Sequence, residues 1–232
     1  MNTNRKKALP LLVIGGFALL LFLIELISVA SEQRWVAKFD LMWIERIRDG
    51  HITPSTTRMV EFLTHFGSAE YIIVMTIIVV IVLFILRKFV VGLWFGGTVL
   101  LCGVVLNLVF KHTVERARPN AANWLISETG YSYPSGHATA TSVFYGLTAL
   151  FLIFTVRQMW LKIVVGVVGL FIICYIMYSR VYLGVHFPTD VFGGFLFGMA
   201  SIFLSTGVYF LVRKPLHDLL KKWRINDKSI TE

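Results

Sequence analysis

The chain has 232 residues, of which 56% are hydrophobic and 15% are charged, and its mean hydropathy is +0.74. A soluble domain carries about 25% charged residues, so this composition excludes an ordinary soluble domain and indicates an integral membrane protein. The net charge of +9 does not point to nucleic-acid binding, because the basic residues gather at the ends of apolar runs. We expect one transmembrane domain over residues 1–232.

A helix needs about 20 apolar residues to cross a bilayer, and the apolar runs of this chain predict six such spans. They cover residues 9–30, 69–86, 89–110, 137–156, 160–178 and 190–212. The first run is too long for the apolar region of a signal peptide and is expected to be a retained span. The predicted fold class is therefore all-α, an integral membrane six-helix bundle. Cys102 and Cys174 fall within apolar runs and are expected to be buried packing residues.

Residues 31–68, between the first two spans, are predicted to form an interfacial segment. Leu41, Ile44 and Ile47 recur at helical spacing, and the tryptophans of this segment suit a membrane interface. We favour a helical cap that packs on the bundle. A membrane-surface lip that admits lipid head groups is the alternative.

Lys and Arg residues indicate the orientation, because cytoplasmic loops of membrane proteins are enriched in them. With the N-terminus inside, the inner ends of the spans carry Arg5, Lys6, Lys7, Arg87, Lys88, Arg157, Lys162, Arg213, Lys214, Lys221, Lys222, Arg224 and Lys228. The opposite ends carry fewer basic residues. We therefore expect a multi-pass protein of the cell membrane with both termini in the cytoplasm.

Three motifs place polar residues at the outer ends of the spans. They read KHTVERARP from Lys111 to Pro119, PSGH from Pro134 to His137, and SRVYLGVHFPTD from Ser179 to Asp190. The first follows the third span, the second opens the fourth, and the third joins the fifth to the sixth. Because consecutive helices usually neighbour each other, we expect the motifs to converge at the outer face.

The residue types in these motifs suit phosphoryl transfer. His186 is the candidate nucleophile, because a neutral imidazole nitrogen attacks phosphorus and divides one difficult step into two. Asp190 is expected to accept the other ring N–H of His186, which fixes the tautomer and stabilises the developing positive charge. His137 is the candidate general acid, which protonates the leaving oxygen and then activates water.

Three cations and the start of the fourth span form the predicted phosphate-binding group. Lys111, Arg118 and Arg180 supply fixed positive charge for the phosphoryl oxygens. Ser135 is a good N-cap, and Gly136 lets backbone N–H groups approach an anion closely. No cofactor or metal is expected, because the sequence has no cluster of carboxylates near the histidines.

These motifs resemble those of the type 2 phosphatidic acid phosphatase superfamily, which also includes the vanadium haloperoxidases. Every signature identity is present between Lys111 and Asp190. The resemblance implies a phosphohistidine mechanism without metal and the residue roles given above. The resemblance does not identify the substrate.

The remaining polar residues receive structural interpretations. His51, His65 and His217 lie outside the motifs, and His112 sits beside Lys111 but is not one of the signature residues. Glu115 and Arg116 are interpreted as a solvated pair at free positions of the first motif. Glu25, within the first span, is expected to hydrogen-bond to a neighbouring helix or to reach the interface. Tyr131 and Tyr133 suit either a head-group pocket or interfacial anchoring.

The leading hypothesis is a membrane lipid phosphatase that removes the terminal phosphate of a lipid phosphate or diphosphate. The resemblance suggests undecaprenyl diphosphate or phosphatidylglycerol phosphate as substrate, and phosphatidic acid in addition. An outward site favours the first, because that carrier is released outside. The alternatives are a lipid phosphotransferase with the same site, which the sequence does not separate from a phosphatase, and a lipid transporter. Against the transporter, the ionisable residues gather at span ends rather than at the bilayer midplane. The sequence does not indicate the oligomeric state, or whether the 120–133 loop gates the site.

Overall fold

The computed structural model describes residues 3–229, and the described residues form helices and loops without strands. The bundle consists of α1 (Thr3–Ala30), α4 (Ala69–Ile85), α5 (Phe89–Thr98), the π-helix η2 (Val99–Leu106), α6 (Asn107–Val114), α7 (Gly136–Thr155), α8 (Met159–Tyr182) and α9 (Pro188–Lys222). The elements outside it are α2 (Arg34–Arg48), α3 (Pro54–Thr64) and the short 3-10 helices η1 (His65–Gly67) and η3 (Ala121–Asn123). The all-α prediction is confirmed.

The described residues contain five continuous helical stretches that are long and apolar enough to cross a membrane. They are Asn4–Ala30, Phe89–Val114, Gly136–Thr155, Met159–Tyr182 and Pro188–Lys222. The stretch Phe89–Val114 joins α5, η2 and α6 into one span. The second predicted span, residues 69–86, corresponds to α4, which follows Pro54–Gly67 at a bend of 44° and reaches sufficient length only together with it. The number of spans is therefore five, or six when the bent pair is counted.

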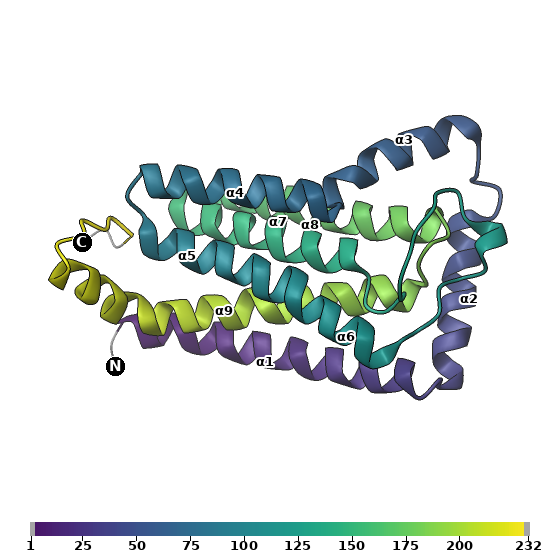
Figure 1. The fold of residues 1–232 in the computed structure, drawn as a ribbon, viewed down its shortest axis with the longest axis horizontal. Coiled ribbons are helices and arrows are strands. Elements are labelled where there is room, and N and C mark those ends of the chain that lie inside the picture. Colours follow the sequence, from purple (N-terminus) through teal and green to yellow (C-terminus); the bar gives the residue numbers. More distant parts are fainter. Residues whose placement is uncertain (1–2, 230–232) are drawn as a thin grey trace.

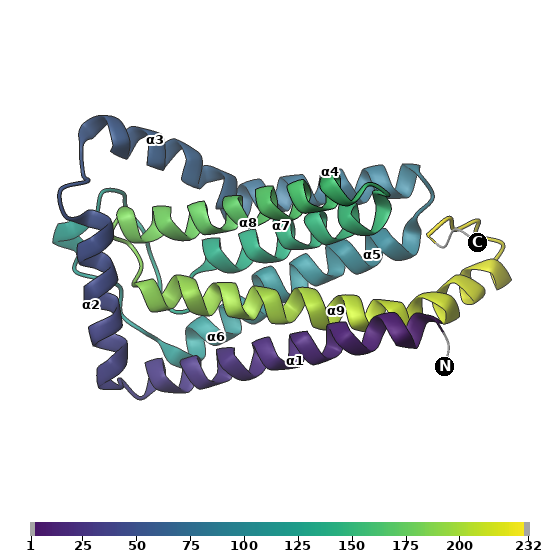
Figure 2. The same ribbon diagram turned by 180° about the vertical axis from the view of Figure 1, so that it is seen from behind.

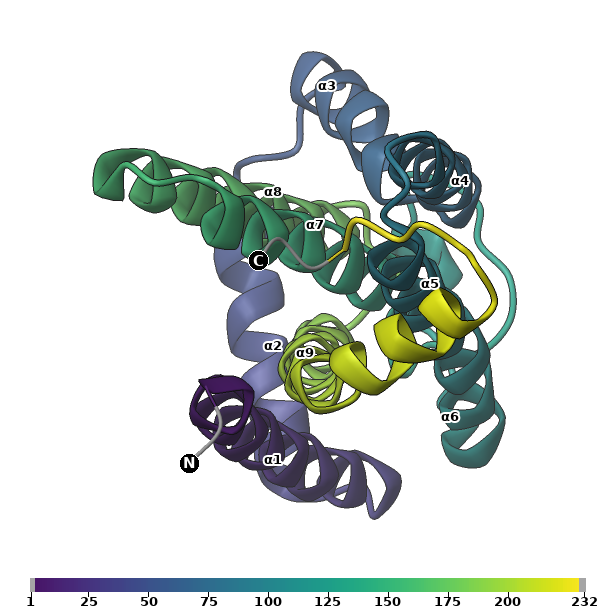
Figure 3. The ribbon, with the colours of Figure 1, turned by 90° about the vertical axis from the view of Figure 1, so that its left-hand side faces the viewer.

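Helix α9 is the centre of the bundle. It packs against α1 and α7, and it lies beside α1 along much of the length of both helices (Figures 1 and 2). Figure 3 shows the bundle from one end, with α9 between α1 and α7. Gly194 permits the close approach to α7, because a Cβ there would lie 2.9 Å from the Ser135 carbonyl oxygen and 3.0 Å from Ala138 Cβ. The two helices therefore bring the second and third motifs together.

Helix α8 lies at the periphery and exposes large apolar side chains such as Ile163, Val167 and Phe171, as expected of a surface in contact with lipid. Both cysteines are free thiols, and Cys102 is half-buried. Cys174 is exposed on α8. The prediction that Cys174 is a buried packing residue is wrong, because a peripheral helix keeps an apolar sequence on the side that faces lipid.

The segment between α1 and α4 covers one end of the bundle. Helix α2 lies across that end (Figure 1) and packs against α8 and α9, as expected for a helical cap. Helix α3 packs against α8, where Thr56 Oγ1 lies 2.7 Å from the Tyr182 hydroxyl. Both described ends of the chain lie at the other end of the bundle. The three motifs lie at the α2 end.

Candidate active site

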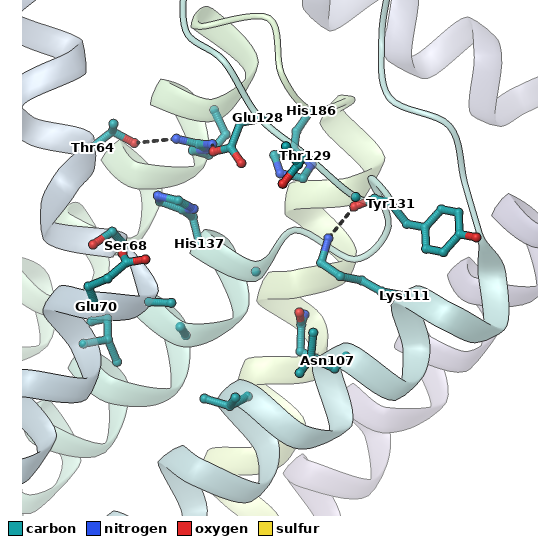
Figure 4. Close-up of a pocket in the computed structure, with 18 of the residues that line it drawn as sticks. Thr64, Ser68, Glu70, Asn107, Lys111, Glu128, Thr129, Tyr131, His137 and His186 are labelled. Carbon is teal, nitrogen blue, oxygen red and sulfur yellow. Dashed lines mark hydrogen bonds and ion pairs between the residues drawn. The ribbon is translucent and has the colours of Figure 1, made fainter.

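The three motifs meet around one cavity. Lys111 lies in the last turn of α6, Arg118 in the loop that follows it, His137 in the first turn of α7 and Arg180 near the end of α8. With His186, these four side chains line a cavity of about 850 Å³, part of which is drawn in Figure 4. Gly136 lines it as well. Histidines and cations that are far apart in the sequence thus face a common space.

His186 and Asp190 form a buried pair at the start of α9. Pro188 is the first residue of the helix, which places Asp190 in its first turn. The Asp190 Oδ2 atom lies 3.3 Å from His186 Nδ1 and accepts a 2.8 Å hydrogen bond from the Phe187 N–H. Ser132 Oγ donates a short hydrogen bond to the same oxygen. This carboxylate therefore favours the tautomer of His186 that carries its proton on Nδ1.

The other nitrogen of His186 faces the cations. Its Nε2 lies 3.1 Å from Nη1 of Arg118. Burial lowers the pKa of His186 to about 4, against the opposing effect of Asp190. The ring is therefore neutral at neutral pH. With Nδ1 protonated, the lone pair of Nε2 accepts the hydrogen bond from Arg118.

Backbone carbonyls hold the guanidinium of Arg118. It donates to the carbonyl oxygens of Gly130 and Val185, both at 2.9 Å, and of Thr129 at 2.8 Å. Burial lowers the pKa of Arg118, but an arginine remains charged in proteins. Arg118 is therefore a fixed positive charge beside His186.

Glu128, in the loop between η3 and α7, bridges the two arginines of the site. It pairs closely with Nη2 of Arg180, and its Oε2 lies 3.7 Å from Nη2 of Arg118. Arg180 is 1% exposed, and it also lies 3.4 Å from Thr64 Oγ1 of α3. The Glu128 side chain is 24% exposed. A phosphate that binds both arginines would compete with this carboxylate. Sequence analysis missed Glu128, because a lone acid in a loop carries no periodic signal.

Helix α7 begins at a capped turn close to α6. Ser135 caps the helix, and its Oγ accepts a 3.4 Å hydrogen bond from the Ala138 N–H. At Gly136, a Cβ would lie 3.5 Å from Asn107 Oδ1 and 4.0 Å from Lys111 Cε, so α6 approaches this turn closely. The Lys111 ammonium donates a 2.5 Å hydrogen bond to the Tyr131 carbonyl oxygen (Figure 4).

Two of the predicted site residues do not line the cavity. Ser135 and Asp190 are fully buried behind its wall, where the Ser135 N–H donates a 2.9 Å hydrogen bond to the Asp190 carbonyl oxygen. The Ser135 hydroxyl is directed at the helix cap, so Ser135 supports the site from behind. The assignment of Ser135 to the phosphate-binding group stays a prediction.

His137 projects into the cavity opposite His186. Figure 4 shows its ring between Ser68, at the start of α4, and the Glu128 carboxylate. The described residues include no group of three or more His, Cys, Asp or Glu side chains placed to hold a metal ion.

The interpretation of Glu115 and Arg116 as a solvated pair is wrong. Glu115 accepts a 2.9 Å hydrogen bond from the Tyr131 hydroxyl, whereas Arg116 turns inward to the Asp190 carboxylate at 2.6 Å. The two residues diverge because Glu115, in the left-handed region at φ 51°, ends α6 and redirects the chain. Glu25 is buried, and the Tyr133 hydroxyl donates to it at 3.3 Å.

Residues 91–214, which contain all three motifs, match the PAP2 superfamily. The chain belongs to this superfamily. It is 33% identical over 162 residues to phosphatidylglycerophosphatase B of Bacillus subtilis (strain 168), across 66% of this chain and 75% of that protein. It is 38% identical over 110 residues to an undecaprenyl-diphosphatase of Sulfolobus acidocaldarius, across 45% of this chain and 49% of that protein.

Two solved PAP2 structures share this architecture. The crystal structure of a transmembrane PAP2 type phosphatidylglycerolphosphate phosphatase from Bacillus subtilis matches with a TM-score of 0.71 at 29% identity. That match covers 84% of this chain and 95% of the other. The structure of LpxE from Aquifex aeolicus matches at a TM-score of 0.55 and 23% identity, covering 72% and 93% of the two chains, which is a likeness of fold. This PAP2 protein is a membrane hydrolase of the lipid phosphatase class.

Proposed function

We propose that this PAP2 protein hydrolyses the terminal phosphate of a lipid phosphate or diphosphate through a phosphohistidine on His186, without a metal ion. The observation that carries the proposal is the placement of His186, whose Nε2 lies 3.1 Å from Nη1 of Arg118 while Asp190 Oδ2 lies 3.3 Å from Nδ1. A phosphate that binds Arg118 would replace His186 as the acceptor of this N–H, which frees the Nε2 lone pair for attack beside the cation.

The reaction has two steps. In the first, His186 Nε2 attacks phosphorus, the bond from phosphorus to the lipid oxygen breaks, and His137 gives a proton to that oxygen. In the second, His137 takes a proton from water, the resulting hydroxide attacks phosphorus, and the bond from phosphorus to Nε2 breaks to release inorganic phosphate. Lys111, Arg118 and Arg180 stabilise the charge on the phosphoryl oxygens in both steps.

The cavity supports a lipid substrate because it is polar at one end and apolar at the other. Its apolar walls include Ile72 and Ile73 of α4 and Val104 and Leu108 on η2 and α6. Ile73 is 44% exposed and Leu108 is 51% exposed, so the cavity reaches the lipid-facing surface between these helices. An acyl or prenyl chain could stay in the bilayer while its phosphate reaches His186.

Undecaprenyl diphosphate and phosphatidylglycerol phosphate are the substrates we propose, with phosphatidic acid as a third. The names of the similar proteins from Bacillus subtilis and Sulfolobus acidocaldarius support the first two. The basic residues at the other end of the bundle support a site on the outer face of the membrane. An outer site places undecaprenyl diphosphate first, because that carrier is released outside the cell.

Phosphate release by the purified protein tests this proposal. The three lipids are offered in parallel with EDTA present, and His186→Ala is the control variant. We expect release that persists in EDTA and disappears in the variant. Release that the variant retains, or that EDTA abolishes, would overturn the mechanism. Transfer of phosphate to a second lipid, detected by thin-layer chromatography, would instead identify a phosphotransferase.

A further inference from the structure

Arg116 joins two buried carboxylates from different parts of the chain. Its Nη1 lies 2.6 Å from Asp190 Oδ1, and its Nη2 lies 2.7 Å from Asp40 Oδ2 on α2. The guanidinium also lies 4.2 Å from the centre of the Phe187 ring. Burial lowers the pKa of Arg116, but Asp190 and Asp40 more than offset this and raise it. Arg116 is therefore a permanent cation between the two acids.

Asp40 also holds the first turn of α9. Its Oδ1 accepts a 2.8 Å hydrogen bond from the Thr189 N–H, and its Oδ2 accepts a 3.0 Å bond from Thr189 Oγ1. The Thr189 hydroxyl lies 2.7 Å from Arg116 Nη1. This turn carries Asp190, so α2 is connected to the catalytic pair through both backbone and side chain.

The two oxygens of Asp190 have separate partners. Oδ2 contacts His186, Ser132 and the Phe187 N–H, whereas Oδ1 contacts Arg116. Arg116 thus fixes the rotation of the carboxylate that orients His186. It also lies between two buried negative charges that would otherwise repel each other.

We propose that Arg116 and Asp40 are positioning residues that act on the reaction through Asp190, so that the cap helix α2 is part of the catalytic assembly. This inference rests on the proposed function, because it assigns these residues to the His186–Asp190 pair. Asp40 lies outside the three motifs, and Arg116 occupies a free position of the first motif.

The two residues carry opposite charges, so their removal has opposite electrostatic effects. The charged and titratable groups around His186 and Asp190 are Glu25, Asp40, Lys111, Arg116, Arg118, Glu128, Tyr133, His137 and Arg180. Arg116→Gln removes a positive charge and raises the pKa of His186. Asp40→Asn removes a negative charge and lowers the pKa of His186. The acid limb of the pH–rate profile should move up in the first variant and down in the second.

The test measures kcat, KM and the pH profile of phosphate release, with the fastest of the three lipids and the full-length protein. For Arg116→Gln we expect kcat to fall about 10- to 100-fold at an unchanged KM, in the range found for residues that orient a ligand or base. The midpoint of the acid limb should shift to higher pH by about half a unit or more. For Asp40→Asn we expect a smaller loss of kcat and a downward shift. Arg116→Lys should restore the position of the limb, because it restores the charge.

Matched controls separate these effects from general damage. Arg46→Gln and Asp49→Asn make the same changes at exposed positions on and beside α2, and both should behave as wild type. Loss of kcat in Arg116→Gln and Asp40→Asn with an unmoved acid limb would reduce the two residues to a structural role and overturn the inference. Full activity in both would overturn it as well. Activity that survives in His186→Ala would instead refute the proposed function.

Discussion

The Glu128 carboxylate pairs with the two arginines that we assign to phosphate binding, so removal of its charge should strengthen substrate binding. The Glu128→Gln substitution keeps the shape of the side chain and removes its charge. A hydrogen bond between charged groups contributes about 1.5–3 kcal/mol. Because Glu128 is 24% exposed, solvent screening reduces this to about 1–2 kcal/mol. A substrate that no longer displaces the carboxylate should gain this amount, which corresponds to a KM about 5- to 30-fold lower.

The value of kcat should stay near that of wild type, since Glu128 is displaced in both the bound substrate and the transition state. The assay is steady-state phosphate release, with the inhibition constant of inorganic phosphate as a second readout that should fall by a similar factor. Glu70→Gln is the matched control, because Glu70 lines the same cavity and lies on α4. A lower kcat or a higher KM in Glu128→Gln would refute the reasoning and show that Glu128 assists the reaction.

Three further predictions follow from the site. Asp190→Asn should lower kcat for phosphate release by about 1,000- to 10,000-fold with little change in KM, because the tautomer of His186 is no longer fixed. A loss of kcat below tenfold would contradict this role of Asp190. Activity should persist on the acid side until the pH falls through about 4, because burial lowers the pKa of His186 to about 4 and the ring attacks only when neutral; a limb that follows His186 near pH 6.5 would contradict this. Ala122→Cys, introduced into a variant without Cys102 and Cys174, should react with an impermeant maleimide in intact cells. The reason is that η3 lies at the end of the bundle that we assign to the outside. Labelling only after permeabilisation would mean that the orientation is the reverse.

The sequence predicts the helices well because their apolar runs are long. It misplaces their ends where a tertiary contact satisfies a polar residue. The fifth span was expected to stop at residue 178, before Ser179 and Arg180, but α8 continues to Tyr182. Ser179 Oγ lies 2.8 Å from Thr64 Oγ1 of α3, and Arg180 pairs with Glu128. Both partners come from distant parts of the chain, so no local sequence pattern predicts these contacts.

The motifs predict the residues that line the site, but not the residues that hold them. Lys111, Arg118, His137, Arg180 and His186 meet in one cavity as expected. The supporting contacts of Asp40, Arg116 and Ser132 depend on how α2 and the 120–133 loop fold over the site. Asp40 carried one usable signal: it lies at helical spacing between Val36 and Ile44, on the face of α2 that turns toward the bundle.

The central claim is that His186 forms a covalent bond to phosphorus, and trapping that intermediate tests it most directly. The His137→Ala variant, in which release of phosphate from the enzyme should be slowed, is mixed with a lipid that carries ³²P in its terminal phosphate and is then quenched in alkali. We predict a labelled protein whose label is stable to alkali and labile to acid, as expected of a phosphoramidate, and which maps to His186. Label on another residue, or no labelled protein while phosphate is still released, would contradict the account.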